Sequence, residues 1–181
     1  MTTIDVSIAI VNFNTVDFIE PLIETIRAQE YTVDGRPGVT EIVLIDNASK
    51  GEDSGGLSDL VADDVRVIQN TQNTGYAQAN NQGFHVARGT YHMVLNPDTR
   101  LLPGCLANLV GPLEANAGIA MVGPKAFMDL DETMVMPPNE LPTPALLSKQ
   151  SDAQKDEGAA EENLDRRTRF SWSYWSATEP I

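Results

Sequence analysis

The stretch Tyr91-His92-Met93-Val94-Leu95-Asn96-Pro97-Asp98-Thr99 joins a short apolar run to a polar turn. The run Tyr91–Leu95, closed by a proline, is typical of a buried strand. Because proline has no N–H for a sheet ladder, we expect the strand to end at Asn96. Asp98 then follows the carboxyl end of a strand, which is where open α/β sheets bind their ligands.

Asp98 has two interpretations. A carboxylate at this edge can hold a divalent cation, and the cation can bridge a diphosphate. Alternatively, Asn96-Pro97-Asp98 is only a turn that leads into the next helix, with Asp98 or Thr99 as its cap. The nonapeptide alone leaves both open, so the rest of the chain has to decide between them.

Apolar runs alternate with amphipathic segments along most of the first 125 residues. We expect strands at Asp5–Val11, Glu41–Ile45, Val65–Ile68, Tyr91–Leu95 and Ile119–Val122. We expect helices at Thr15–Gln29, Leu57–Ala62, Tyr76–Arg88 and Leu101–Ala115. This alternation predicts the α/β class: a mainly parallel sheet with right-handed crossovers and helices on both faces.

The regularity fades after Pro124. We expect residues 1–125 to form the α/β core and 126–148 an irregular, proline-rich hairpin of Ala126–Met128 with Met134–Met136. Residues 149–168 are acidic and nearly free of large apolar groups, which predicts a mobile loop. Residues 169–181 carry an aromatic cluster with Trp172 and Trp175, which we expect to be exposed.

The charge balance excludes several classes of function. Twenty-six acidic residues against twelve basic ones give a net charge of −14, with only four lysines. This argues against binding nucleic acid or an anionic membrane surface, and a salt-rich habitat is one hypothesis for it. No apolar run approaches a membrane span, no signal peptide is visible, and Cys105 is the single cysteine. We therefore expect a cytoplasmic protein, attached at most to the inner face of the membrane through partners.

Polar clusters follow three of the expected strands. In a parallel sheet the carboxyl ends of the strands share one edge, so Asn12/Asn14, Asp46/Asn47/Ser49 and Asn96/Asp98 can converge. The loop and helix start Asn73–Asn80 should border the same edge. Amides with one or two carboxylates suit a nucleotide and a phosphate-bound metal. The sequence has no GxGxxG or GxxxxGK[ST] loop, which argues against a dinucleotide enzyme or a P-loop phosphotransferase.

Four segments carry a family resemblance in the expected order: Ile10-Val11-Asn12-Phe13-Asn14, Ile45-Asp46-Asn47-Ala48-Ser49, Asn73-Thr74-Gly75-Tyr76-Ala77-Gln78-Ala79-Asn80-Asn81-Gln82-Gly83 and Leu95-Asn96-Pro97-Asp98-Thr99. Together they resemble the family 2 glycosyltransferases of GT-A fold. The most similar subgroup is the rhamnosyltransferase-like branch that builds bacterial and archaeal surface polysaccharides. The resemblance implies an inverting transferase that uses a nucleotide-diphosphate sugar and Mg²⁺ or Mn²⁺.

The resemblance also implies roles for individual residues. Asp46 would contact the nucleotide base, with Asn12 and Asn14 lining the same pocket. Asn96 stands where the family's DxD motif often has its first Asp and would lie near the ribose, and Asp98 would be the metal ligand. The alternative is that these groups only cap turns and helices, including Asn73 and Asn80 at the start of the helix from Tyr76.

No residue of this sequence matches the family's catalytic base. It usually belongs to an acidic pair in an acceptor region, which here would begin near Phe170 and stop at Ile181. The carboxylates of Asp129, Asp131 and Glu132 stand too early in the chain to match. We therefore expect a GT-A fold truncated before the acceptor-binding part, in which the catalytic residue is unknown.

Three functions are compatible with this sequence to different degrees. The first is a glycosyltransferase whose donor-binding region is this chain, acting on a surface polysaccharide, glycan or lipid-linked acceptor. The second is a non-catalytic nucleotide-sugar-binding or interaction module. A sugar nucleotidyltransferase is disfavoured, because it needs a glycine-rich basic loop where Asn12-Phe13-Asn14-Thr15 stands.

Overall fold

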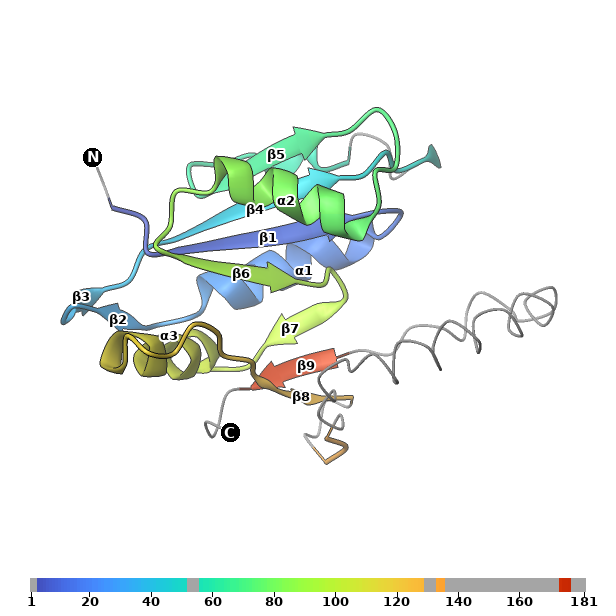
Figure 1. Ribbon diagram of the computed structural model, residues 1–181. Helices are drawn as coiled ribbons and strands as arrows, with labels where there is room; N and C mark the ends of the chain where they lie inside the picture. Colours follow the sequence, from blue (N-terminus) through green and yellow to red (C-terminus); the bar gives the residue numbers. More distant parts are fainter. Residues whose placement is uncertain (1–2, 52–55, 129–132, 136–172, 177–181) are drawn as a thin grey trace, which may run out of the picture.

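The computed structural model describes residues 3–51, 56–128 and 133–135, and the backbone of 173–176. Its main sheet has the order β5-β4-β1-β6, and every neighbouring pair is parallel (Figure 1). The four strands are β1 (Val6–Asn12), β4 (Thr40–Asp46), β5 (Val65–Gln69) and β6 (Tyr91–Leu95). The predicted parallel sheet is confirmed, and β6 has the bounds expected from its apolar run.

Helices cover both faces of this sheet, as the sequence predicted. They are α1 (Val16–Arg27), α2 (Tyr76–Val86) and α3 (Cys105–Ala115), with a short 3-10 helix η2 at Ser58–Leu60. Ile8 and Ile10 of β1 pack in a core with α1 and α3, whereas Ala9 and Val11 pack on the other face with α2. The alternation of side chains along a strand thus divides the interior into two apolar layers.

Helix α2 lies close to the sheet because of a glycine. A Cβ added at Gly83 would lie 3.0 Å from the Cβ of Ala9 and 3.0 Å from Cδ1 of Ile45. The missing side chain lets the helix backbone approach β1 and β4. The start of α2 is thereby held beside the carboxyl edge of these strands (Figure 1).

Two smaller sheets accompany the main one. A hairpin joins β2 (Thr32–Val33) to β3 (Arg36–Pro37). Strand β9 (Ser173–Ser176) lies between β7 (Thr99–Leu101), which runs parallel to it, and the antiparallel β8 (Lys125–Phe127). The sequence did not predict β9, because its pairing joins segments far apart in the chain.

Two predictions of secondary structure differ from the observed elements. The expected helix Leu101–Ala115 begins only at Cys105, because Gly104 adopts a left-handed backbone (φ 80°) and Leu101 belongs to β7. Ile119–Val122 forms no strand, and Met121 is 86% exposed. β-branched composition favours a strand there, but no described residue supplies the ladder partner that a strand requires.

Two contacts join Phe127 and Met128 to residues 134 and 135, and the expected hairpin itself stays a prediction because its turn lies outside the described residues. Phe127 forms an antiparallel bridge with Val135, and the N–H of Met128 donates to the carbonyl oxygen of Met134 at 2.8 Å. Residues 129–132, Met136, the expected mobile loop 149–168 and Trp172 lie outside the described residues.

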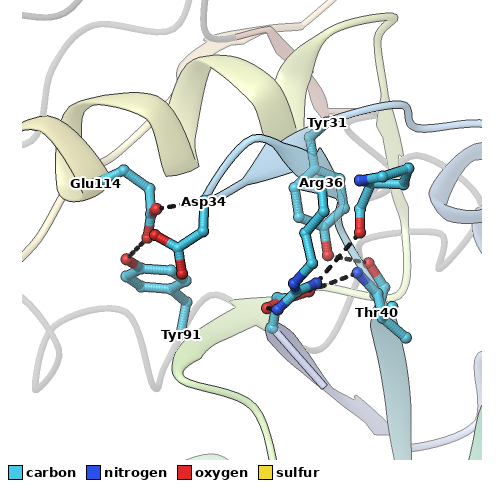
Figure 2. A network of polar contacts seen from close by, with 9 residues as sticks. Tyr31, Asp34, Arg36, Thr40, Tyr91 and Glu114 are labelled. Carbon is cyan, nitrogen blue, oxygen red and sulfur yellow. Dashed lines mark hydrogen bonds and ion pairs between the residues drawn. The ribbon is translucent and has the colours of Figure 1, made fainter. Parts of the chain in front are cut away.

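A polar network joins residues at the amino-terminal edge of the main sheet (Figure 2). Arg36 of β3 donates two hydrogen bonds to the buried carboxylate of Asp5, at 2.8 and 2.7 Å. These bonds, together with one from the N–H of Val39, lower the pKa of Asp5 although its burial opposes the shift. The hydroxyl of Tyr91 donates to Glu114 of α3, which raises the pKa of Tyr91 to about 12.

Candidate functional site

A cleft of about 370 Å³ opens at the carboxyl edge of the parallel sheet. Its walls come from the ends of β1, β4 and β6 and from the start of α2. Three of the residues predicted for binding, Asn73, Asn96 and Asp98, line it. The complete set of lining residues is Val11, Phe13, Thr15, Asn47, Asn73, Tyr76, Asn96, Pro97 and Asp98.

Asn12 and Asp46 form a buried polar bridge at the same edge, below the cleft. They stand opposite each other at the last paired position of β1 and β4, and Nδ2 of Asn12 donates to Oδ1 of Asp46 at 3.1 Å. Asp46 also accepts from the backbone N–H and hydroxyl of Ser49 and from Nε2 of Gln69. Both carboxylate oxygens therefore have partners within the protein, which satisfies a charge that is only 1% exposed.

The loops that follow β1 and β4 hold each other in place. Asn14 and Ala48 have left-handed backbones, with φ of 57° and 66°. Oδ1 of Asn14 accepts from the backbone N–H of Lys50 at 2.9 Å, and the hydroxyl of Ser49 accepts from the backbone N–H of Asn14 at 3.0 Å. Asn14 itself is exposed and does not line the cleft. In this arrangement it supports the two loops.

Asn47 anchors the loop before α2. Its Oδ1 accepts from Nδ2 of Asn70, and from the backbone N–H and hydroxyl of Thr74, all at 3.1 Å. Its Nδ2 donates to Oδ1 of Asn73 at 2.8 Å, and that oxygen also accepts from the N–H of Gly75. One buried amide thus ties the end of β4 to the residues that enter α2.

Tyr76, the first residue of α2, reaches across to the end of β6. Its hydroxyl donates to Oδ1 of Asn96 at 2.8 Å, and its side chain is half exposed. Asn80, one turn later, donates from Nδ2 to the carbonyl oxygen of Tyr76 at 2.9 Å. Asn80 is 5% exposed, and its Oδ1 is a buried oxygen without a hydrogen-bond partner in the described part of the chain. Asn80 therefore stabilises the first turn of α2 from below the cleft.

Among the described residues that line the cleft, only Asp98 has an acidic side chain. Burial raises its pKa above the ordinary value of 3.8, and a backbone hydrogen bond offsets part of that rise. None of the nine lining residues is basic, so no ion pair with them compensates the carboxylate. A bound cation would offset the free-energy cost of burying the ionised carboxylate.

The donor atoms around Asp98 fit one kind of metal site. The described residues include no group of three or more His, Cys, Asp or Glu side chains that could hold an ion. Mg²⁺ and Mn²⁺ are often bound by one or two carboxylates together with phosphate oxygens of the substrate. The cleft therefore fits an ion that arrives with a diphosphate, and does not fit a metal held by the protein alone.

A family model described as glycosyl transferase family 2 matches residues 7–163. The chain belongs to this family. The match confirms the family expected from the four motifs, although the rhamnosyltransferase-like branch is a finer assignment than the match makes.

Other similar proteins agree with this family. The succinoglycan biosynthesis protein ExoO of Rhizobium meliloti (strain 1021) is 30% identical over 112 residues, which are 61% of this chain and 30% of ExoO. A solved structure of the mannosyltransferase PcManGT from Pyrobaculum calidifontis, in complex with GDP-Man and Mn²⁺, is similar in fold. Its TM-score is 0.51 at 22% identity, over 69% of this chain and 35% of that one.

The structural likeness confirms the expected GT-A, Rossmann-like fold. S. aureus TarS 1-349 in complex with UDP-GlcNAc is also similar, with a TM-score of 0.44 at 17% identity over 52% of this chain and 27% of TarS. This family member spans about a third of the length of ExoO and PcManGT. No helix in the described ranges is long and apolar enough to cross a membrane.

A second and larger cavity, of about 460 Å³, lies between β6 and α3. Its walls are almost wholly apolar, with Met93, Leu106 and Val110 among them. Because polar side chains and a carboxylate converge on the smaller cleft, the smaller cleft is the better candidate for a nucleotide.

Sequence reasoning missed two aromatic residues of the cleft. Phe13 is 40% exposed at the end of β1, and Tyr76 is 50% exposed on the opposite wall. Their positions in the sequence could have indicated a place in the cleft, since Phe13 stands between two asparagines at a strand end and Tyr76 follows Gly75 at a helix start. Exposed aromatic rings beside a polar cleft are suited to contact a base or a sugar.

Proposed function

We propose that this chain binds the nucleotide-diphosphate-sugar donor of an inverting glycosyltransferase that depends on Mg²⁺ or Mn²⁺. The observation that carries the proposal is the convergence of Asn73, Asn96 and Asp98 on one cleft at the carboxyl edge of the sheet. Membership of glycosyl transferase family 2 supports it, as does the likeness to a polysaccharide biosynthesis protein. The acceptor we propose is a surface polysaccharide, glycan or lipid-linked saccharide, in the rhamnosyltransferase-like branch.

Different residues of the cleft make different contacts with the donor in this proposal. Phe13 and Tyr76 offer aromatic surface to the nucleotide, and Asn73 and Asn96 offer amide groups. Asn12, Asp46 and the other buried amides hold these groups in position from below. Asp46 is predicted to contact the base, but its two oxygens are already bonded inside the protein. We therefore propose that it acts on the base chiefly through the loops that it orders.

The reaction proposed for the whole enzyme is a single displacement. An acceptor hydroxyl attacks the anomeric carbon, the bond from that carbon to the diphosphate oxygen breaks, and a base takes the hydroxyl proton. A divalent cation bound at Asp98 would neutralise charge on the departing diphosphate. The cleft residues of this chain bind and orient the donor, and the base is unassigned.

The second candidate is a nucleotide-sugar-binding module without catalysis. One observation favours it: Asp98 is the single carboxylate among the residues that line the cleft, so the described site has a metal ligand but no separate base. Both candidates predict donor binding. They differ in turnover, which an assay for released nucleotide in the presence of donor and acceptor libraries would detect.

Donor binding can be tested by thermal unfolding with a panel of nucleoside diphosphates and Mn²⁺. A ligand at about 100 times its Kd stabilises the folded state by about 2.7 kcal/mol, which is visible as a higher Tm. We expect at least one of UDP, GDP, CDP and dTDP to do this. Phe13→Ala should reduce the shift, whereas Met121→Ala, on a side chain that is 86% exposed and outside the cleft, should not. No shift with any nucleotide would contradict the proposal.

A further inference from the structure

One hydrogen bond orients the side-chain amide of Asn96, and a second is made by its backbone carbonyl. Tyr76 donates its hydroxyl hydrogen to Oδ1 of Asn96 at 2.8 Å, and the hydroxyl of Thr99 donates to the backbone carbonyl oxygen of Asn96 at 2.7 Å. Tyr76 comes from the first turn of α2, and Asn96 follows the last residue of β6. Two separate elements thus meet through one phenol–amide bond at the rim of the cleft.

The orientation decides what Asn96 can offer to a ligand. Because its oxygen is occupied by Tyr76, its remaining polar group is Nδ2, which carries two N–H donors. Among the described residues, Nδ2 of Asn96 has no hydrogen-bond partner. Asn96 is exposed, and it lines the cleft together with Asp98. The end of β6 therefore presents an amide donor at Asn96 two residues before the carboxylate of Asp98. Two carboxylates at these positions would present only acceptors.

We propose that Tyr76 is a positioning residue that turns the amide of Asn96 so that Nδ2 donates to an anionic oxygen of the donor's diphosphate. The inference rests on the proposed function, because it takes the ligand to be a nucleoside diphosphate. It differs from the role that the family resemblance implies for Asn96, which is a position near the ribose. It adds that this cleft holds the diphosphate in two ways: through a cation at Asp98 and through a neutral amide at Asn96. The amide contact does not need the metal.

Two substitutions separate this role from a direct contact by Tyr76. Tyr76→Phe keeps the ring but removes the hydroxyl, so the amide of Asn96 is free to rotate and its donor is presented only part of the time. The expected loss of nucleoside diphosphate affinity, measured in EDTA, is about 3- to 10-fold, as for one hydrogen bond. In an Asn96→Ala background the same Tyr76→Phe change should alter the affinity less than about 1.5-fold, because the group that it positions is gone.

Asn96→Asp tests the chemistry of the contact. The aspartate still accepts from Tyr76, but it places a negatively charged oxygen where the amide donor stood. We expect affinity for the nucleoside diphosphate in EDTA to fall by about 10-fold or more, since a charge-assisted donor is exchanged for a repelling charge. With Mn²⁺ present much of this loss should be recovered, because a second carboxylate favours the cation. For Tyr76→Phe the matched control is Tyr91→Phe, because Tyr91 also donates its hydroxyl hydrogen to a side chain, Glu114, at the opposite edge of the sheet.

The experiment is a calorimetric double-mutant cycle on the full chain with UDP and GDP in EDTA, together with ¹⁵N spectra of the side-chain amides. We expect the coupled losses described above, and a displaced Asn96 amide resonance in ligand-free Tyr76→Phe but not in Tyr91→Phe. Equal effects of Tyr76→Phe in both backgrounds, or an unmoved Asn96 resonance, would overturn the positioning role alone. Wild-type protein that binds no nucleoside diphosphate with or without Mn²⁺ would overturn the proposed function, and with it the ligand assigned to Asn96.

Discussion

Asn12 and Asp46 face each other at the last paired position of β1 and β4, and their side chains are hydrogen-bonded at 3.1 Å with less than 2% of either residue exposed. A buried carboxylate is tolerated there because it accepts from an amide, a hydroxyl, a backbone N–H and Gln69. The pair joins the two central strands at the edge where the cleft opens. The strand ends that carry the cleft residues Val11 and Asn47 are therefore also part of the protein's buried interior.

Asp46→Asn should lower the free energy of unfolding by about 1–3 kcal/mol, because its new NH₂ group would face donors on Asn12, Ser49 or Gln69. Urea unfolding monitored by circular dichroism gives this value. Asp63→Asn is the matched control, since Asp63 is exposed. Equal stability of the two variants would show that the buried network contributes little.

Asp98→Asn should raise the Tm of the ligand-free protein at neutral pH, because it removes a carboxylate whose ionised form is disfavoured by burial. The sign of the pH dependence follows from the raised pKa. Below the ordinary value of 3.8 both states of the wild type are protonated, and the variant gains nothing. As the pH rises from 3.8 through the raised pKa, the wild type loses stability and the variant does not. A Tm difference that is constant across this window would contradict the assignment.

Gly89→Ala should destabilise the fold by about 1–3 kcal/mol, because a Cβ there would lie 2.7 Å from the backbone nitrogen of Ser7 in β1. Gly111→Ala, in the middle of α3, meets nothing within 4 Å and should stabilise by about 0.5–1 kcal/mol. Chemical denaturation of both variants gives the two changes in the free energy of unfolding. A Gly89→Ala variant as stable as the wild type would mean that the turn before β6 is not packed against β1 as described.

Arg36→Gln should lower the free energy of unfolding at neutral pH, because it removes two hydrogen bonds from the buried carboxylate of Asp5. Arg27→Gln is the control: its ion pair with Asp64 is more exposed and should contribute at most about 1 kcal/mol. The lowered pKa of Asp5 gives the wild type stability that is present above the ordinary value of 3.8 and is lost as the pH falls through the lowered pKa. Arg36→Gln should lose less stability over this acid range, and an unchanged slope would refute the role of the pair.

The sequence predicted the strands of the main sheet well, for a physical reason. Tyr91–Leu95 was predicted with its observed bounds because a buried parallel strand needs a continuous apolar run and Pro97 cannot extend the ladder. The convergence of Asn73, Asn96 and Asp98 followed from the same logic, since parallel strands share their carboxyl edge. That these residues contact a nucleotide stays a prediction.

Features that depend on distant partners were not predictable from local pattern. Ile119–Val122 has strand composition but no described partner. Residues 169–181 are predicted to be an uncovered aromatic segment, whereas Ser173–Ser176 within them pairs with both β7 and β8. The phenol of Tyr76 was missed because its contact with Asn96 depends on where α2 begins relative to β6. Pairing and helix placement are properties of the whole fold, and hydrophobic periodicity does not encode them.

We propose that the cleft binds a nucleoside diphosphate together with a cation at Asp98. Calorimetric titration of the best nucleotide from the panel, with and without Mn²⁺, into wild type and Asp98→Ala tests it most directly, with Asp63→Ala as the control. We predict tighter binding with Mn²⁺ for the wild type and the control, and loss of that difference in Asp98→Ala. Equal affinity of the wild type with and without Mn²⁺ would contradict the account and leave Asn96-Pro97-Asp98 as a turn only.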